Sequence, residues 1–242
     1  MKFSQLHSAD ADSFTFALIT DTHSEYDEFR DAVRHINSNP DIIFVIHAGD
    51  MTDYGLQEEY KWAVDILDDL AVPFFTVIGN HDCLANGKHI YTTMFGDTYY
   101  SRILSGHDSG MAFKFLFLND NTLEYDIKPG ETEKMLAWLE NELVGGTDCR
   151  SIFVTAHVPP YSALYFTDEQ EEFFRSLMAR YNVLLFMTGH NHRFQYSEFY
   201  GDGVMYLRGD DIRDRNYCTV TVYPHMNTER GTPVLNVKRI YF

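Results

Sequence analysis

The chain has 242 residues and a formal net charge of −17 at pH 7, with 36 Asp and Glu against 19 Lys and Arg. This acidity argues against a nucleic-acid surface, which needs clustered cations, and no apolar run approaches the about 18–20 residues of a membrane helix. Because 45% of the residues are hydrophobic, the chain can bury a sizeable core, and we expect residues 1–242 to form a single domain.

The N-terminus and the cysteines are the two features of the sequence that indicate the cellular compartment. Residues 1–12 lack the apolar core of a signal peptide. The three cysteines are scattered and form neither a disulfide framework nor a CxxC zinc pattern. We therefore expect a cytoplasmic protein without a membrane span, and an export signal trimmed from the sequence stays open as the alternative. Its oligomeric state stays open, and an aromatic-rich C-terminal sheet is a candidate dimer face.

In chain order, the first part alternates predicted strands and helices. Residues 14–19 and 42–46 are apolar runs of strand type, and residues 26–36 between them carry apolar side chains at helical spacing. A second amphipathic helix follows over residues 56–70, and residues 72–78 predict a third strand. This β-α-β-α-β order favours parallel strands covered by helices, and ligands then bind beyond the carboxyl ends of the strands.

The rest of the chain continues the alternation less regularly. Residues 83–110 are aromatic and punctuated by glycine, and we expect one short helix and part of the substrate rim there. Thr167 and Gln170 form a capping box that opens a helix. Residues 194–242 are rich in Tyr and Val and predict antiparallel strands. The other predicted elements are strands over 113–118, 152–155 and 183–187, and helices over 131–143 and from Thr167 to about Tyr181.

Polar, metal-competent side chains follow five of these strands at the point where each strand ends. They are Asp21, His23, Asp50, Asn80, His81, His157, His190 and His192. Taken singly, each has an ordinary explanation, since Asp21 or Asp50 would cap a helix or turn and His157 would be a loop histidine. Their coincidence at five strand ends favours one site. Carboxylate, imidazole and amide groups together suit two divalent transition ions, which can activate a water and clamp a phosphoryl group.

The same residues spell DxH, GDxxD, GNHD, a lone His and GHxH, in that order, between residues 21 and 192. This series resembles the motifs of the calcineurin-like metallophosphoesterases. The fold that the resemblance implies is α/β, with two packed β-sheets flanked by helices in a four-layer sandwich. The C-terminal strands are candidates for the second sheet.

Carried over position by position, the resemblance implies a role for each of these residues. The ion ligands would be Asp21, His23 and His192 for one ion, Asn80, His157 and His190 for the other, and Asp50 as the bridge. His81 would protonate the leaving group or contact the phosphate, with Asp82 next to it as the carboxylate that orients its imidazole. Mn, Fe, Zn, Ni and Co all accept such ligands.

Departures from the family pattern narrow the expected substrate. Ser/Thr protein phosphatases carry phosphate-gripping arginines where this chain has Tyr54 and Ile78, and purple acid phosphatases carry an iron-binding tyrosine where it has Asp53. We expect Asp53 to be a structural hydrogen-bond acceptor. The spacing is most similar to the class III cyclic-nucleotide and glycerophosphodiester phosphodiesterases.

The resemblance therefore predicts a binuclear metal-dependent hydrolase of small phosphate esters, with a metal-bridging hydroxide as nucleophile and His81 assisting the leaving group. Phosphodiesters are favoured because few cations are evident to hold a dianion. A phosphomonoesterase with the same site and a non-catalytic scaffold of the same fold stay open as alternatives, whereas a nuclease is disfavoured by the acidity. Tyr161, Phe166 and Arg208 are further candidates to contact the substrate.

Overall fold

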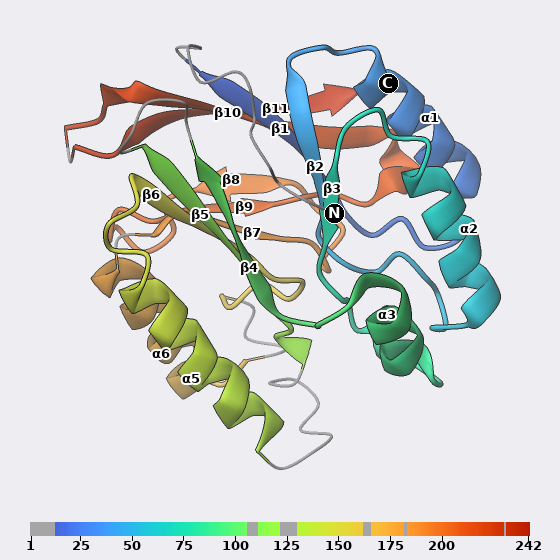
Figure 1. The fold of residues 1–242 in the computed structure, drawn as a ribbon, viewed down its shortest axis with the longest axis horizontal. Helices are drawn as coiled ribbons and strands as arrows, with labels where there is room; N and C mark the ends of the chain where they lie inside the picture. The colour runs from blue at the N-terminus through green and yellow to red at the C-terminus, as the bar shows by residue number, and fades with distance from the viewer. Residues whose placement is uncertain (1–12, 106–110, 122–129, 162–165, 182, 230) are drawn as a thin grey trace.

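The structure is a computed structural model that describes residues 13–105, 111–121, 130–161, 166–181, 183–229 and 231–242 (Figure 1). The strands are β1 (Phe14–Ile19), β2 (Ile42–His47), β3 (Phe74–Thr76), β4 (Tyr100–Ser105), β5 (Ala112–Phe117), β6 (Ser151–Thr155), β7 (Val183–Thr188), β8 (Gln195–Ser197), β9 (Met205–Arg208), β10 (Asn216–Asn227) and β11 (Pro233–Tyr241). The α-helices are α1 (Tyr26–Asn37), α2 (Gln57–Leu67), α3 (Gly87–Phe95), α5 (Glu131–Val144) and α6 (Asp168–Arg180), with 3-10 turns at His81–Cys83 and Ile212–Asp214. No helix among these residues is long and apolar enough to span a membrane.

The strands form two mixed sheets. The first has the order β11-β10-β1-β2-β3 and the second the order β4-β5-β6-β7-β9-β8. Strands β1, β2 and β3 are parallel, as the β-α-β-α-β order predicts, and so are β5, β6, β7 and β9. Antiparallel strands β10 and β11 complete one edge of the first sheet, and antiparallel strands β4 and β8 form the two edges of the second.

The origin of the second sheet differs from the expectation that the C-terminal strands would supply it. Strands β10 and β11 instead extend the first sheet beyond β1, and only β8 and β9 join the second sheet, beyond β7. The second sheet begins in the middle of the chain with the edge strand β4, where Ile103 is half exposed. Because β4 lies at an edge with one face open, it lacks the continuous apolar run by which a buried strand is found in a sequence.

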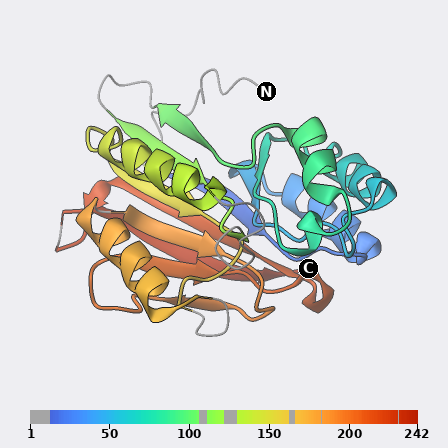
Figure 2. The ribbon, with the colours of Figure 1, turned by 90° about the horizontal axis from the view of Figure 1, so that it is seen from below.

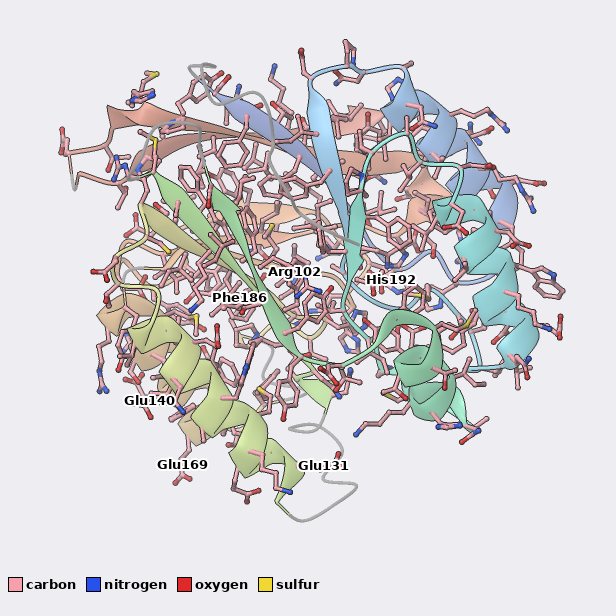
Figure 3. All side chains as sticks on the ribbon, viewed as in Figure 1. Arg102, Glu131, Glu140, Glu169, Phe186 and His192 are labelled. Carbon is pink, nitrogen blue, oxygen red and sulfur yellow. The ribbon has the colours of Figure 1, made fainter. Side chains whose placement is uncertain are left out.

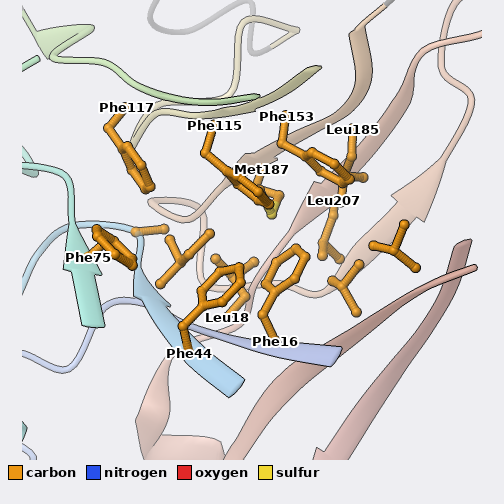
Figure 4. Close-up of a cluster of buried hydrophobic side chains, with 14 of the residues drawn as sticks. Phe16, Leu18, Phe44, Phe75, Phe115, Phe117, Phe153, Leu185, Met187 and Leu207 are labelled. Atoms are coloured by element: carbon orange, nitrogen blue, oxygen red, sulfur yellow. The ribbon is translucent and has the colours of Figure 1, made fainter. Parts of the chain in front are cut away.

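Alternation of side chains along the strands produces four layers. On β1, Phe16 and Leu18 point into the core between the sheets, whereas Ala17 and Ile19 face α1 and α2. Phe16 stacks on Phe44 with ring centroids 4.9 Å apart and meets Phe115 of the opposite sheet edge-on (Figure 4). Helices α5 and α6 cover the outer face of the second sheet (Figure 2). The predicted four-layer sandwich is confirmed.

Helix α6 begins with the predicted capping box. Thr167 Oγ1 accepts a hydrogen bond from the Gln170 N–H at 3.2 Å, and Gln170 Oε1 accepts one from the Thr167 N–H at 2.8 Å. We expect Thr167→Ala to lower the free energy of unfolding by about 1 kcal/mol, because an amide of the first turn loses its acceptor. Urea denaturation measures this change. Ser176→Ala, on the same helix and outside the cap, is the matched control, and equal effects of the two variants would contradict the capping role.

Candidate metal centre

The loops that follow β1, β2, β3, β6 and β7 bring the expected metal ligands together in two groups. Asp21, His23 and His192 offer ligand atoms that all lie within 4.8 Å of one another, and the same holds for Asp50, His157 and His190. Asn80 belongs to the second group, since its Oδ1 lies 3.0 Å from His157 Nε2 and 2.9 Å from His190 Nδ1. Apart from Asp50, which was expected as the bridge, the members of these groups are the residues expected at the two ion sites.

Asp50 lies between the two groups. Its Oδ2 is 3.2 Å from His157 Nε2 in the second group and 3.9 Å from His23 Nε2 in the first. Its Oδ1 accepts a hydrogen bond from the His81 N–H at 2.9 Å. The Asp50 side chain is almost fully buried. This carboxylate therefore faces histidines of both groups.

The backbone around these side chains is strained. The left-handed region is rare for residues other than glycine and costs roughly 1–3 kcal/mol each when the surrounding structure enforces it. Five of the expected ligands have a positive φ, namely Asp21 (51°), His23 (43°), Asp50 (54°), His190 (72°) and His192 (48°). Such strain concentrated at one set of loops is typical of functional sites.

Motif glycines make room for carboxylates from neighbouring loops. A Cβ on Gly79 would collide with Asp50 Oδ1, and a Cβ on Gly189 would collide with Asp21 Oδ2. Backbone hydrogen bonds join the same loops, from the His23 N–H to the Asp50 carbonyl at 3.1 Å and from the Gly189 N–H to the His157 carbonyl at 3.0 Å. The glycines are thus required by the close packing of the loops.

The protonation states of the site fit the binding of cations. Although burial opposes its charge, Asp50 raises the pKa of His157 to about 10, and hydrogen bonds to Asp21 and Asp211 raise the pKa of His192 to about 10. These protons balance the buried carboxylates Asp21 and Asp50. Burial lowers the pKa of His190 to about 4, which keeps its imidazole neutral as a metal ligand requires. Divalent ions would replace the two protons and supply more positive charge beside the same carboxylates.

The environment of His23 is a second observation that fits the binding of a cation. Both of its ring nitrogens are buried and make no hydrogen bond to any residue that the structure describes. Asp53 Oδ1 lies 3.2 Å from Nδ1 without hydrogen-bond geometry. Buried polar atoms without a partner are rare, and an ion bound at one nitrogen would satisfy it. The donor set of imidazole, carboxylate and amide oxygen suits divalent transition ions.

His81 and Asp82 occupy different environments. His81 Nδ1 lies 2.8 Å from the carbonyl oxygen of Asp53, and its ring meets that of His23 edge-on with centroids 4.9 Å apart. Asp82 accepts hydrogen bonds from Thr52 Oγ1 at 2.8 Å and from the Gly79 N–H at 2.9 Å. The expectation that Asp82 orients the His81 imidazole is therefore wrong, because a backbone carbonyl does so. Asp82 instead ties together the loops that carry Asp50 and Asn80.

Comparison with known proteins shows the family to which the chain belongs. The model of the family described as calcineurin-like phosphoesterase matches residues 14–194. The chain belongs to this family. A relative named "Probable glycerophosphodiester phosphodiesterase GpdQ", from Arcobacter nitrofigilis, is 30% identical over 173 residues, which cover 66% of this chain and 61% of the relative. The chain thus matches less than two thirds of that relative's length.

Solved structures share the calcineurin-like fold. GAP50, the anchor in the inner membrane complex of Plasmodium, superposes with a TM-score of 0.75 at 16% identity, over 95% of this chain and 84% of its own. A dimetal phosphatase from Danio rerio gives a TM-score of 0.69 at 16% identity, over 94% of this chain and 98% of its own. At these identities the likeness concerns the fold alone.

Two carboxylates of this calcineurin-like site were missed by the sequence reasoning. Asp120 accepts hydrogen bonds from the backbone N–H of His157 at 3.2 Å and of Val158 at 3.1 Å. Its position just after the apolar run 113–118 is the same strand-end signal that located the other ligands. Asp211 Oδ2 lies 3.2 Å from His192 Nδ1, while His192 Nε2 lies 3.3 Å from Asp21. No motif of the family pattern marks Asp211.

The burial of four further side chains shows whether each belongs to the core or to the surface. Phe166 is buried and meets Phe174 edge-on beneath α6, so it belongs to the core and the expectation of a substrate contact is wrong. Ile78 is buried between β1 and the helices, and the side chain of Tyr54 is 63% exposed. His47, at the end of β2, is fully buried, with its Nε2 3.0 Å from Thr22 Oγ1.

We expect Asp211→Asn to weaken the binding of a divalent ion by the Asp21 group by about 10- to 100-fold. The carboxylate fixes the ring orientation and raises the basicity of His192, and partners of this kind typically contribute that much to metal affinity. Competition with a chelating dye measures the affinity without recourse to activity. Asp214→Asn, which makes the same charge change at an exposed position nearby, is the control, and equal affinities of the two variants would refute this role.

Proposed function

We propose that this chain is a binuclear metal-dependent phosphodiesterase that acts on small phosphate diesters. The observation that carries the proposal is the pair of ligand groups with Asp50 between them and His81 alongside. Asp21, His23 and His192 would hold one ion, Asn80, His157 and His190 the other, and Asp50 would contact both. Bound divalent ions would supply an activated water and positive charge for the phosphoryl oxygens.

The chain itself supplies the proton for the leaving group. His81 Nδ1–H donates to the Asp53 carbonyl oxygen, which orients the ring and leaves Nε2 to carry the transferable proton. The Asp50 carboxylate accepts from the backbone N–H of His81 and so fixes the ring beside the ligand groups. An imidazolium in this place can protonate the leaving alkoxide of an ester.

Two features support a diester over a monoester. The positions of the phosphate-gripping arginines of protein phosphatases hold Tyr54 and Ile78, so those two cations are missing from this site. The relative from Arcobacter nitrofigilis is named for the hydrolysis of glycerophosphodiesters. A singly charged diester demands less positive charge than a dianionic monoester.

Hydrolysis of a matched pair of substrates tests the proposal. Bis(p-nitrophenyl) phosphate and p-nitrophenyl phosphate share a leaving group, and we expect the manganese-loaded protein to show the higher kcat/KM with the diester. A preference for the monoester would make the protein a phosphatase with the same site. If the protein binds metal but hydrolyses neither compound, the proposal is wrong and the scaffold alternative is favoured.

A further inference from the structure

Strand β9 ends in a buried arginine that has no acidic partner. Arg208 is 8% exposed, and its Nε donates to the carbonyl oxygen of Arg193 at 2.7 Å. Its guanidinium also lies over the ring of Tyr161, 5.8 Å from the centroid. Among the described residues, no carboxylate comes within 4.0 Å of it, and no further hydrogen-bond partner is found.

A buried arginine is unusual within the described part of the chain, where every other arginine is at least partly exposed. Arg239 pairs with Asp210, Arg215 with Asp31, and Arg175 with Glu172, at partly or well exposed positions. With 36 acidic residues against 19 basic ones, carboxylates are plentiful, yet none of the described ones faces Arg208. A buried charge without a counter-ion is costly, so its retention points to an anionic ligand.

Arg208 borders the loops of the metal centre. Thr188, its register partner on β7, directly precedes Gly189 and His190. Arg193, which accepts its hydrogen bond, directly follows His192. Tyr161 lies four residues beyond His157. The guanidinium is therefore placed beside two loops that carry expected ion ligands, the one after β7 with His190 and His192 and the one after β6 with His157.

Two hydroxyls, Thr188 Oγ1 and Tyr161 Oη, lie next to Arg208 and interact with each other. Both are buried, and neither makes a hydrogen bond to any other group in the part of the chain that the structure describes, so one proton of the pair is left to donate to a ligand. Burial raises the pKa of Tyr161, so its hydroxyl stays protonated and can donate. A guanidinium beside a pair of hydroxyls is a donor set suited to phosphate oxygens, since arginine binds such anions through two parallel N–H groups.

We propose that Arg208 binds an anionic phosphate oxygen of the substrate, with the hydroxyl pair of Tyr161 and Thr188 as an additional donor. The inference rests on the proposed function and extends it to the recognition of the substrate. Arg208 ends a strand of the second sheet, whereas His81 follows β3 of the first, so the two groups reach the metal centre from different sheets. The oxygen belongs either to the scissile phosphate or to a second phosphate on the substrate.

Inorganic phosphate is the probe for the first experiment. Its inhibition constant against diester hydrolysis is measured for Arg208→Gln and for Arg102→Gln, both in the manganese-loaded protein. Arg102 is the matched control because it also donates to a backbone carbonyl and lies over a tyrosine ring, but on the exposed edge strand β4 (Figure 3). We expect Arg208→Gln to weaken inhibition by about 10-fold or more, the value of a charged hydrogen bond, and Arg102→Gln to leave it unchanged. Equal constants for both variants would overturn the proposal.

Two diesters distinguish the sources of the oxygen. Bis(p-nitrophenyl) phosphate has only the scissile phosphate, whereas a p-nitrophenyl diester of a nucleoside can carry a separate phosphate monoester. If Arg208→Gln lowers kcat/KM for both compounds, Arg208 contacts the scissile phosphate. If it lowers kcat/KM only for the second compound, Arg208 contacts the additional phosphate. An unchanged kcat/KM with both compounds would contradict either assignment.

A stability measurement separates binding from a structural role. If Arg208 only holds the fold together, Arg208→Met lowers the Tm. If Arg208 serves a ligand, the same variant leaves the Tm unchanged or raises it, since it removes an unpaired buried charge. It then also reduces the rise in Tm that inorganic phosphate produces, since the phosphate binds more weakly. A wild-type protein that fails to hydrolyse any diester would refute the proposed function, whereas phosphate binding would still test Arg208.

Discussion

Replacement of Asp50 by Asn is expected to lower kcat/KM for an aryl phosphodiester by on the order of 1,000-fold. Such a loss corresponds to the several kcal/mol that a metal centre contributes to stabilising the transition state. Asp50 Oδ2 faces His157 in one ligand group and His23 in the other, and an amide cannot supply the same negative charge to two ions. Steady-state kinetics and metal content are measured together, and we expect the bound metal to fall with the activity.

The control for this substitution is Asp65→Asn. Asp65 is exposed on α2, so the variant makes the same change of net charge away from the metal centre. We expect it to keep both activity and metal content. Full activity of Asp50→Asn with undiminished metal would show that Asp50 does not join the two ligand groups.

The second large effect is expected for His81→Ala. If His81 protonates the leaving alkoxide, its loss should lower kcat by about 100- to 10,000-fold for an alkyl leaving group, the range of general acid catalysis. The loss should be much smaller for p-nitrophenolate, which departs without a proton. Kinetics with one alkyl and one aryl diester measure the difference, and the metal content should stay constant.

His89→Ala is the matched control, because His89 is an exposed histidine on α3. It should leave both substrates unaffected. An equal loss with alkyl and aryl leaving groups in His81→Ala would refute the role as acid and indicate that His81 positions the phosphate.

Much of the fold could be predicted because buried parallel strands and amphipathic helices have strong local patterns. The runs 14–19 and 42–46 and the stripe of 26–36 correspond to β1, β2 and α1 within a residue. The arrangement of the C-terminal strands could not be predicted. Pairing of Phe14 with Val222 joins residues far apart in sequence, and β8 is only three residues long. Local pattern does not determine such pairings.

The metal centre could be anticipated for a different reason. Parallel strands deliver their following residues to one edge, so polar side chains at five strand ends had to converge. The supporting contacts depend on three-dimensional detail that spacing does not encode. The carbonyl of Asp53 orients His81, the carboxylate of Asp211 faces His192, and Asp82 joins two loops. Only the folded backbone decides which acceptor reaches which ring.

Titration of the metal-free protein with manganese tests the central claim most directly. The protein is stripped with a chelator, and bound metal and hydrolysis of bis(p-nitrophenyl) phosphate are followed together as Mn²⁺ is added. The two ligand groups predict two ions bound per chain, with full activity only when both are present, and the loss of one ion in Asp50→Asn. Full activity with a single ion, or hydrolysis that persists without metal, would contradict a binuclear centre.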